Sequence, residues 1–186
     1  MNATRLLPLL LALVVPPSQA ADWLVVKAES RIAFTATFEG AEFGGEFRDY
    51  SASLRFDPDD LAASRFEVRV ATGSATTGSG ELDDGMRLPD WFDTATFPEA
   101  TFVSRRIEQQ GNHRYVAEGN LTIKGVTRKV RLPFTWTRQG QRAEITGSAT
   151  LNRGDFRIGE GEWADGSVIG LEVTVATRLV LRRAGS

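Results

Sequence analysis

The chain contains no cysteine among its 186 residues and only one histidine. The absence of cysteine excludes disulfides, cysteine-ligated metal sites and a lipid attached through an N-terminal cysteine. The single histidine, His113, lies in Gly111-Asn112-His113, which is typical of a hairpin turn. A metal centre built on imidazoles needs more nitrogen ligands than one. A Ser-His-Asp triad needs a histidine that a carboxylate holds in a cleft. We therefore expect no metal site and no enzyme activity.

A strongly charged surface is also missing. The formal net charge is −2, and acidic and basic residues are interspersed along the chain. Nucleic-acid binders carry a basic patch, and membrane-surface segments carry a polybasic cluster. Neither pattern is present, so we expect no nucleic-acid partner.

Long apolar runs are scarce, and the main one lies near the N-terminus. Leu6–Val15 follows Arg5 and precedes Ser18-Gln19-Ala20, where small residues suit signal peptidase. The run is too short to span a bilayer, and no positive flank follows it, which disfavours an uncleaved anchor. The pattern predicts a signal peptide over residues 1–20, a single domain over 21–186 and a periplasmic location.

Beyond residue 20, apolar and polar residues alternate with period two, which is typical of strands with one buried face. Turn signals such as Lys124-Gly125 separate the runs at hairpin spacing. We expect an all-β, extended antiparallel barrel of about eight strands, with a two-sheet sandwich as the alternative. The expected strands are 30–38, 42–57 (bent in the middle), 64–72, 99–109, 113–123, 127–137, 141–152 and 166–182, with a short edge strand near 23–27.

One segment, residues 78–97, does not alternate. Pro89 is suited to a first helical position, and Asp90 to the first turn, so a short helix carrying Trp91 and Phe92 is expected. The helical segment is placed near 80–93. It would either cover one end of the barrel or simply connect two strands.

Few polar residues form a pattern that suggests chemistry. The acidic cluster around Asp83 and Asp84 does not match a calcium loop, and helix capping is the favoured interpretation. Arg153 and Asp155 follow a strand and lead into a glycine-rich loop. They could contact a phosphate or other polar head group at the barrel mouth. The alternative is an internal ion pair that ties the loop.

Small residues such as Ala36 and Gly147 recur on the inward faces, mixed with large aromatic ones. A barrel of about eight strands is near the size at which side chains either fill the interior or leave room for one ligand. The pattern leaves both a ligand cavity and a solid core open.

Several motifs resemble the YceI-like family of exported, lipocalin-like polyisoprenoid-binding proteins, over about residues 22–182. The matching motifs are Ser30-x-Ile32-x-Phe34, Gly45-x-Phe47, Asp90-Trp91-Phe92-Asp93, Phe97-Pro98-x-Ala100-Thr101-Phe102-x-Ser104, Gly119-x-Leu121-Thr122-Ile123-Lys124-Gly125-Val126-Thr127 and Arg153-x-Asp155-Phe156. The resemblance implies a barrel with an apolar pore that holds an isoprenoid lipid for sequestration or transport, with no other cofactor. By position, the implied pore-lining residues are Phe34, Phe47, Trp91, Phe92, Phe102, Leu121, Phe134 and Trp136.

The chain departs from the family pattern in two places. Asp83-Asp84-Gly85-Met86 stands where many members have Asp-x-His-Leu, and Phe38 stands where many have histidine. The Asp-Trp-Phe-Asp variant resembles members found with membrane cytochromes of the b561 type. The resemblance therefore implies a quinone or a polyprenyl phosphate as guest. A solid barrel that docks such a cytochrome is the alternative function, and a homodimer is left open.

Overall fold

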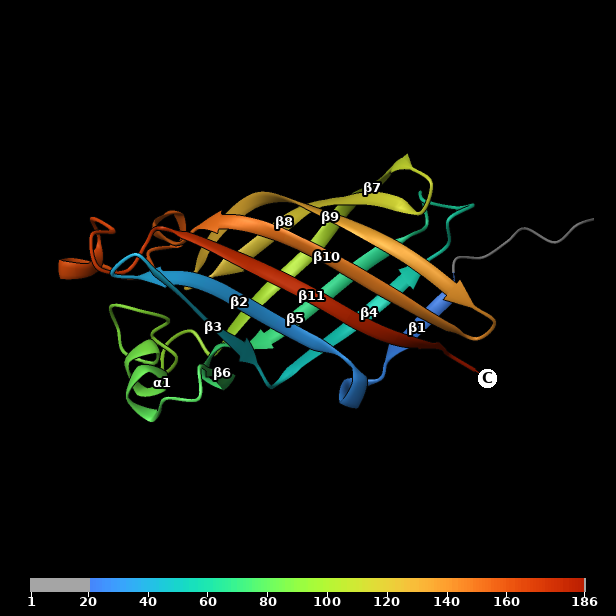
Figure 1. Cartoon of the computed structure of the whole chain (residues 1–186). Helices are drawn as coiled ribbons and strands as arrows, with labels where there is room; N and C mark the ends of the chain where they lie inside the picture. Colours follow the sequence, from blue (N-terminus) through green and yellow to red (C-terminus); the bar gives the residue numbers. More distant parts are fainter. Residues whose placement is uncertain (1–20, 186) are drawn as a thin grey trace, which may run out of the picture.

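The computed structural model describes residues 21–185; the predicted signal peptide, residues 1–20, lies outside the described residues. The fold is an antiparallel β-barrel with one short α-helix, α1 (Gly80–Met86) (Figure 1). The strands are β1 (Ala21–Val25), β2 (Arg31–Phe38), β3 (Ala41–Phe47), β4 (Tyr50–Phe56), β5 (Arg65–Ala71), β6 (Ala75–Thr76), β7 (Glu99–Gly111), β8 (Arg114–Ile123), β9 (Val126–Gln139), β10 (Arg142–Asn152) and β11 (Glu172–Arg183). Single 3₁₀ turns occur at η1 (Lys27–Glu29), η2 (Thr72–Ser74), η3 (Arg153–Phe156) and η4 (Gly161–Trp163).

The barrel closes because β1 pairs with both β4 and β11. The ring runs β1-β4-β5-β7-β8-β9-β10-β11 and back to β1, which confirms the expected eight-stranded barrel. Within the ring, closure gives every strand a partner on both sides, so free sheet edges are confined to the strands outside it. The expected edge strand near 23–27 is therefore β1, which is one of the eight strands of the ring and has a partner on both sides.

The remaining strands extend the wall at one end. β11 pairs through its second half with β1 and through its first half with β2, so β1 and β2 share one side of β11. β3 then pairs with β2, and β6 with β3. The expected bent strand 42–57 is accordingly two strands, β3 and β4. β3 pairs with β2 and β4 pairs with β1, at different levels of the barrel.

The expected helical segment near 80–93 is confirmed as α1, but two finer predictions were wrong. α1 ends at Met86, and the chain then turns back, because the N–H of Phe92 donates to the carbonyl of Met86 at 3.0 Å. Pro89 therefore begins no helix; a residue before proline is disfavoured in helical geometry. β11 begins at Glu172 and not at 166, because Ser167 N–H and Oγ bond the carboxylate of Asp165, both at 2.8 Å, and hold a turn there.

Tight turns carry the hairpins. Lys124 and Gly125 form the two-residue loop between β8 and β9, with φ of 47° and 73°. Two successive positive φ angles match the twist of paired strands, and glycine adopts them at no steric cost. The predicted turn at Lys124-Gly125 is confirmed.

The inward aromatic residues pack into a solid core at the end of the barrel away from α1. Phe56, which is 1% exposed, is at its centre, with the ring of Trp136 at 4.7 Å and that of Tyr115 at 5.1 Å between centroids. The rings of Phe134 and Phe66 pack edge-on and tilted against Phe56, and Trp23 donates its indole N–H to the Phe56 carbonyl. This end of the barrel is filled with side chains.

Candidate functional site

The other end of the barrel is hollow. A cavity of about 700 Å³ opens between the strands and two covering segments, residues 77–97 and 153–170. Figure 1 shows α1 and the loop after β10 at this same end, opposite the C-terminus and the β9–β10 hairpin. The cavity has the size of a small-molecule site, for which 300–1,000 Å³ is typical.

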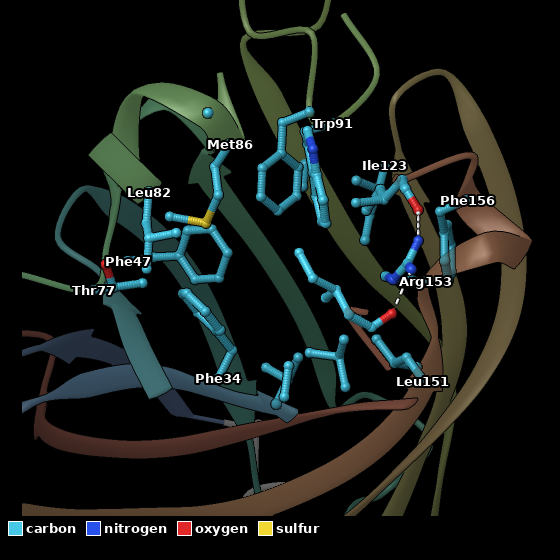
Figure 2. A pocket seen from close by; sticks show the side chains of 18 of the residues that line it. Phe34, Phe47, Thr77, Leu82, Met86, Trp91, Ile123, Leu151, Arg153 and Phe156 are labelled. Atoms are coloured by element: carbon cyan, nitrogen blue, oxygen red, sulfur yellow. Dashed lines mark hydrogen bonds between the residues drawn. The ribbon is translucent and has the colours of Figure 1, made fainter. Parts of the chain in front are cut away.

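The cavity walls are almost entirely apolar. Phe34 and Phe47, whose rings lie 5.5 Å apart, form one side, and Leu151, Ile123 and Phe156 lie across from them (Figure 2). Among the described lining residues, polar side chains are limited to Thr77, Glu81, Asp84 and Arg153. Such a wall stabilises hydrocarbon and offers few hydrogen bonds to a polar guest.

The first covering segment is tied to the barrel by Asp83. Its carboxylate accepts hydrogen bonds from Thr76 Oγ1 at 2.6 Å and from the N–H and Oγ1 of Thr77 at 2.7 and 3.0 Å. The bond from Thr76 is the main reason that the pKa of Asp83 is below its ordinary value. Asp83 thus anchors α1 and presents Leu82 and Met86 to the cavity (Figure 2).

The second covering segment is held by Arg153, which is only 4% exposed. Its five N–H groups donate hydrogen bonds of 2.5–3.0 Å to five main-chain carbonyls that follow η3 in the chain. These acceptors belong to Ile158, Gly159, Trp163, Ile169 and Gly170. Burial lowers the pKa of Arg153 below its ordinary value. Because the guanidinium has five donors in all, a ligand would have to compete with these carbonyls for an N–H.

η3 also closes a gap in the wall. The pairing of β9 with β10 ends at Phe134 and Gly147, although both strands continue. η3 packs against β9 beyond that point, and its Phe156 is 2% exposed. The hydrogen bonds of Arg153 therefore keep the barrel wall sealed next to the cavity.

The two covering segments contact each other over the cavity. The carbonyl of Asp90 accepts from the N–H groups of Gly159 and Glu160 at 2.7 and 2.9 Å. The rings of Trp91 and Trp163 lie 6.0 Å apart, and the Arg153 guanidinium lies 5.4 Å from the Trp91 ring. Together they form one continuous cover.

An ion pair between a buried lysine and a partly exposed glutamate ties this cover to the β8–β9 turn. Lys124 is 4% exposed, and its Nζ donates to Glu160 Oε2 at 2.9 Å and to the Arg157 carbonyl at 2.8 Å. The bonds from Lys124 and then from the Arg157 side chain hold the pKa of Glu160 below its ordinary value. Sequence reasoning read Lys124 only as a turn residue; only its burial, which spacing does not reveal, identifies this role.

The structure brings five of the eight expected pore residues together in the cavity: Phe34, Phe47, Trp91, Phe92 and Leu121. The other three lie elsewhere. Phe134 and Trp136 belong to the solid core, and Phe102 packs against it. Alternation identified the inward face correctly for all three, but the inward face at their level of the barrel is filled.

The expected head-group residues differ in setting. Arg153 lines the cavity with its N–H groups occupied, whereas Asp155 is exposed on η3. The structure gives no Arg153–Asp155 ion pair within the described residues; the acidic group whose charge acts on the pKa of Arg153 is Asp165, which raises it. A head-group contact by either residue stays a prediction.

Phe38, Leu82 and Leu88 line the cavity yet are 42%, 44% and 58% exposed, so they mark its mouth. His113 lies far from the mouth, in the β7–β8 turn, with φ of 57°. Within residues 21–185, no group of three or more His, Cys, Asp or Glu side chains is placed to hold a metal ion. In the same range, no helix has the length and hydropathy needed to cross a bilayer.

Comparison with known proteins agrees with this architecture. Residues 23–181 match the model of the YceI-like domain. A UPF0312 protein of Pseudomonas syringae pv. tomato is 31% identical over 168 residues, which cover 84% of this chain and 86% of that protein.

Two solved structures share the fold. BcnA of Burkholderia cenocepacia superposes with a TM-score of 0.82 at 33% identity, covering 84% of this chain and 98% of that one. A polyisoprenoid-binding domain from Saccharophagus degradans superposes with a TM-score of 0.68 at 17% identity, covering 88% and 99%. A closed barrel with an apolar cavity at one end, matched along nearly its whole length, places this chain in the YceI-like family.

Proposed function

We propose that this protein binds the tail of an isoprenoid lipid, a quinone or a polyprenyl phosphate, and sequesters or transports it. The observation that carries the proposal is the cavity of about 700 Å³ with an almost wholly apolar wall. Each methylene moved from water into such a wall contributes about 0.8 kcal/mol. A hydrocarbon tail is therefore held without any charged clamp.

Binding, and not catalysis, is the activity that the lining residues support. General acid–base or nucleophilic chemistry requires a base within hydrogen-bond reach of the group it activates. The most buried charged group in the described lining, Arg153, spends its N–H groups on carbonyls, and Asp84 pairs with Arg87 at the mouth. These contacts are structural.

The charges at the mouth favour a neutral head group. Glu81 and Asp84 line the cavity on α1, and Arg87 offsets only one of the two. A phosphate here would meet a carboxylate of like charge. Of the two proposed guests, a quinone is therefore favoured.

The comparisons support the same class of guest. The chain shares its fold with a domain described as polyisoprenoid-binding. A periplasmic location is part of the proposal and rests on the sequence of residues 1–20. The alternative of a wholly solid barrel loses support because one end is hollow, and a b561-type partner and a homodimer stay predictions.

The direct test is to purify the protein from its own host without detergent and to weigh it by non-denaturing mass spectrometry. We expect an added mass that organic extraction removes and identifies as an isoprenoid. Cell fractionation and N-terminal sequencing, with Ala21 expected as the first residue, test the location. Protein that is consistently empty and fails to take up a quinone when mixed with one contradicts the proposal.

A further inference from the structure

The cavity has a closed floor. Ile32 belongs both to the cavity lining and to the solid core, and Phe47, Val70 and Val175 line the cavity while packing against that core. These four residues come from β2, β3, β5 and β11, so the floor is built from strands around the barrel. Below it lie Phe134, Phe56 and their neighbours, which fill the space to the far end.

We infer that this floor limits the guest to a tail of about four isoprene units, and that longer tails leave the remainder outside. The inference rests on the proposed function and adds the size of the ligand to it. At the ~30 Å³ that a water-sized group such as a methylene takes in a liquid, the 700 Å³ of the cavity holds about 23 carbons.

The length of the cavity wall along β2 leads to a similar tail length by a separate argument. Ile32 at the floor and Phe38 at the mouth are six residues apart on β2, a span of about 20 Å at ~3.3 Å per residue. An extended peptide covers ~3.4 Å with three backbone bonds. By the same scale, a four-bond isoprene unit covers about 4.5 Å, and a little over four units fit between floor and mouth.

Because burial of hydrocarbon drives binding, affinity depends on how much of the tail is inside. Each unit added up to the fourth finds apolar wall and strengthens binding. Units beyond the fifth remain in water at the mouth and add nothing. The affinity should therefore rise with tail length and then stop rising.

The experiment uses delipidated protein and a series of isoprenoid quinones with two, four and eight units in the tail. Trp91 and Trp163 line the cavity, so quenching of their fluorescence reports binding. We expect the affinity to rise at least about tenfold from two units to four and to change less than about threefold from four to eight.

A variant pair tests the role of the cavity depth. Ala36 is 6% exposed and lines the cavity, whereas Ala33 lies on the opposite face of the same strand and is half-buried. Ala36→Phe fills space, so we expect the rise to stop at a shorter tail. Ala33→Phe, the matched control, should leave the break where it is. Ala100→Leu, a milder filling of the same cavity, replaces Ala36→Phe if that variant does not fold.

The outcomes separate the two claims. An affinity that keeps rising to eight units, or a break that Ala36→Phe and Ala100→Leu both leave in place, overturns the length limit while isoprenoid binding stands. No binding of any member of the series overturns the proposed function itself.

Discussion

The ammonium group of Lys124, in the turn between β8 and β9, lies 2.9 Å from the carboxylate of Glu160, 36 residues later. This bond joins the β8–β9 hairpin of the barrel to the segment that covers the cavity. A lysine as buried as this one, 4% exposed, is tolerated only when its charge is paired and hydrogen-bonded. The pair therefore couples the cover to the barrel.

Replacement of that acid should loosen the cover. Glu160→Gln leaves the buried Lys124 ammonium without its counter-charge, so we expect a lower urea midpoint than in the original protein. Glu162→Gln, which changes an exposed acid two residues away, is the matched control and should leave the midpoint unchanged. Equal midpoints for the two variants contradict this role.

The same pair predicts a pH dependence. The pKa of Glu160 is lowered in the folded protein, so its contribution to stability is complete above the ordinary value of 4.5 and is lost as the pH falls through the lowered value. The midpoint difference between the original protein and Glu160→Gln should therefore shrink in acid. Urea titrations at several pH values measure it, and a difference that grows in acid is the opposite of what we expect.

Arg153 is expected to hold the second covering segment, residues 153–170, in place. Arg153→Ala leaves five carbonyls without their donor and opens space beside η3, so we expect a loss of about 3 kcal/mol in the free energy of unfolding. Arg153→Lys should recover only part of this, because one ammonium cannot reach all five acceptors. The exposed Arg105→Ala is the control, and chemical denaturation is the measurement.

Two phenylalanines on different levels of the barrel should respond differently to the same change. Phe134 lies in the solid core, so Phe134→Leu should lower the free energy of unfolding by about 1–2 kcal/mol with little effect on quinone binding. Phe34→Leu lies on the cavity wall and should weaken binding more than it lowers stability. Denaturation and fluorescence titration of both variants decide this; matching profiles contradict the division into a filled and a hollow end.

Gly119 should tolerate no side chain. A Cβ there would lie 2.5 Å from the Val103 carbonyl and 2.7 Å from the Phe102 ring. Gly119→Ala should therefore cost about 1–3 kcal/mol of stability, as overpacking does. A Cβ at Gly80, the first residue of α1, meets nothing within 4 Å, so Gly80→Ala should be neutral or slightly stabilising.

Local patterning was enough to predict most of the fold. Alternating runs such as Phe66-Val68-Val70 place strands and their inward faces, because the side-chain period of a strand is two residues. What alternation cannot show is the level along the barrel axis. Trp136 and Phe34 both point inward, yet Trp136 packs into the filled core whereas Phe34 lines the cavity.

Contacts between distant segments were also beyond the sequence. The acceptors of Arg153 are carbonyls on a loop whose path depends on tertiary packing, and the partner of Lys124 follows 36 residues later. The break between β1 and β2 was expected, but one of the two bonds that hold it was not. Ser30 ends η1 with its hydroxyl bonded to the Val26 and Val180 carbonyls, and only the second of these comes from a neighbouring strand.

The closed floor restricts how a guest enters and leaves the cavity. A guest that has entered past Phe38 can leave only through the same mouth, because the solid core fills the barrel below the floor. Under the proposed transport function, a supplier and a recipient of the guest would therefore have to reach the same mouth one after the other. Under that function the protein would load and unload through one mouth by turns, and the polar end of the guest would leave first.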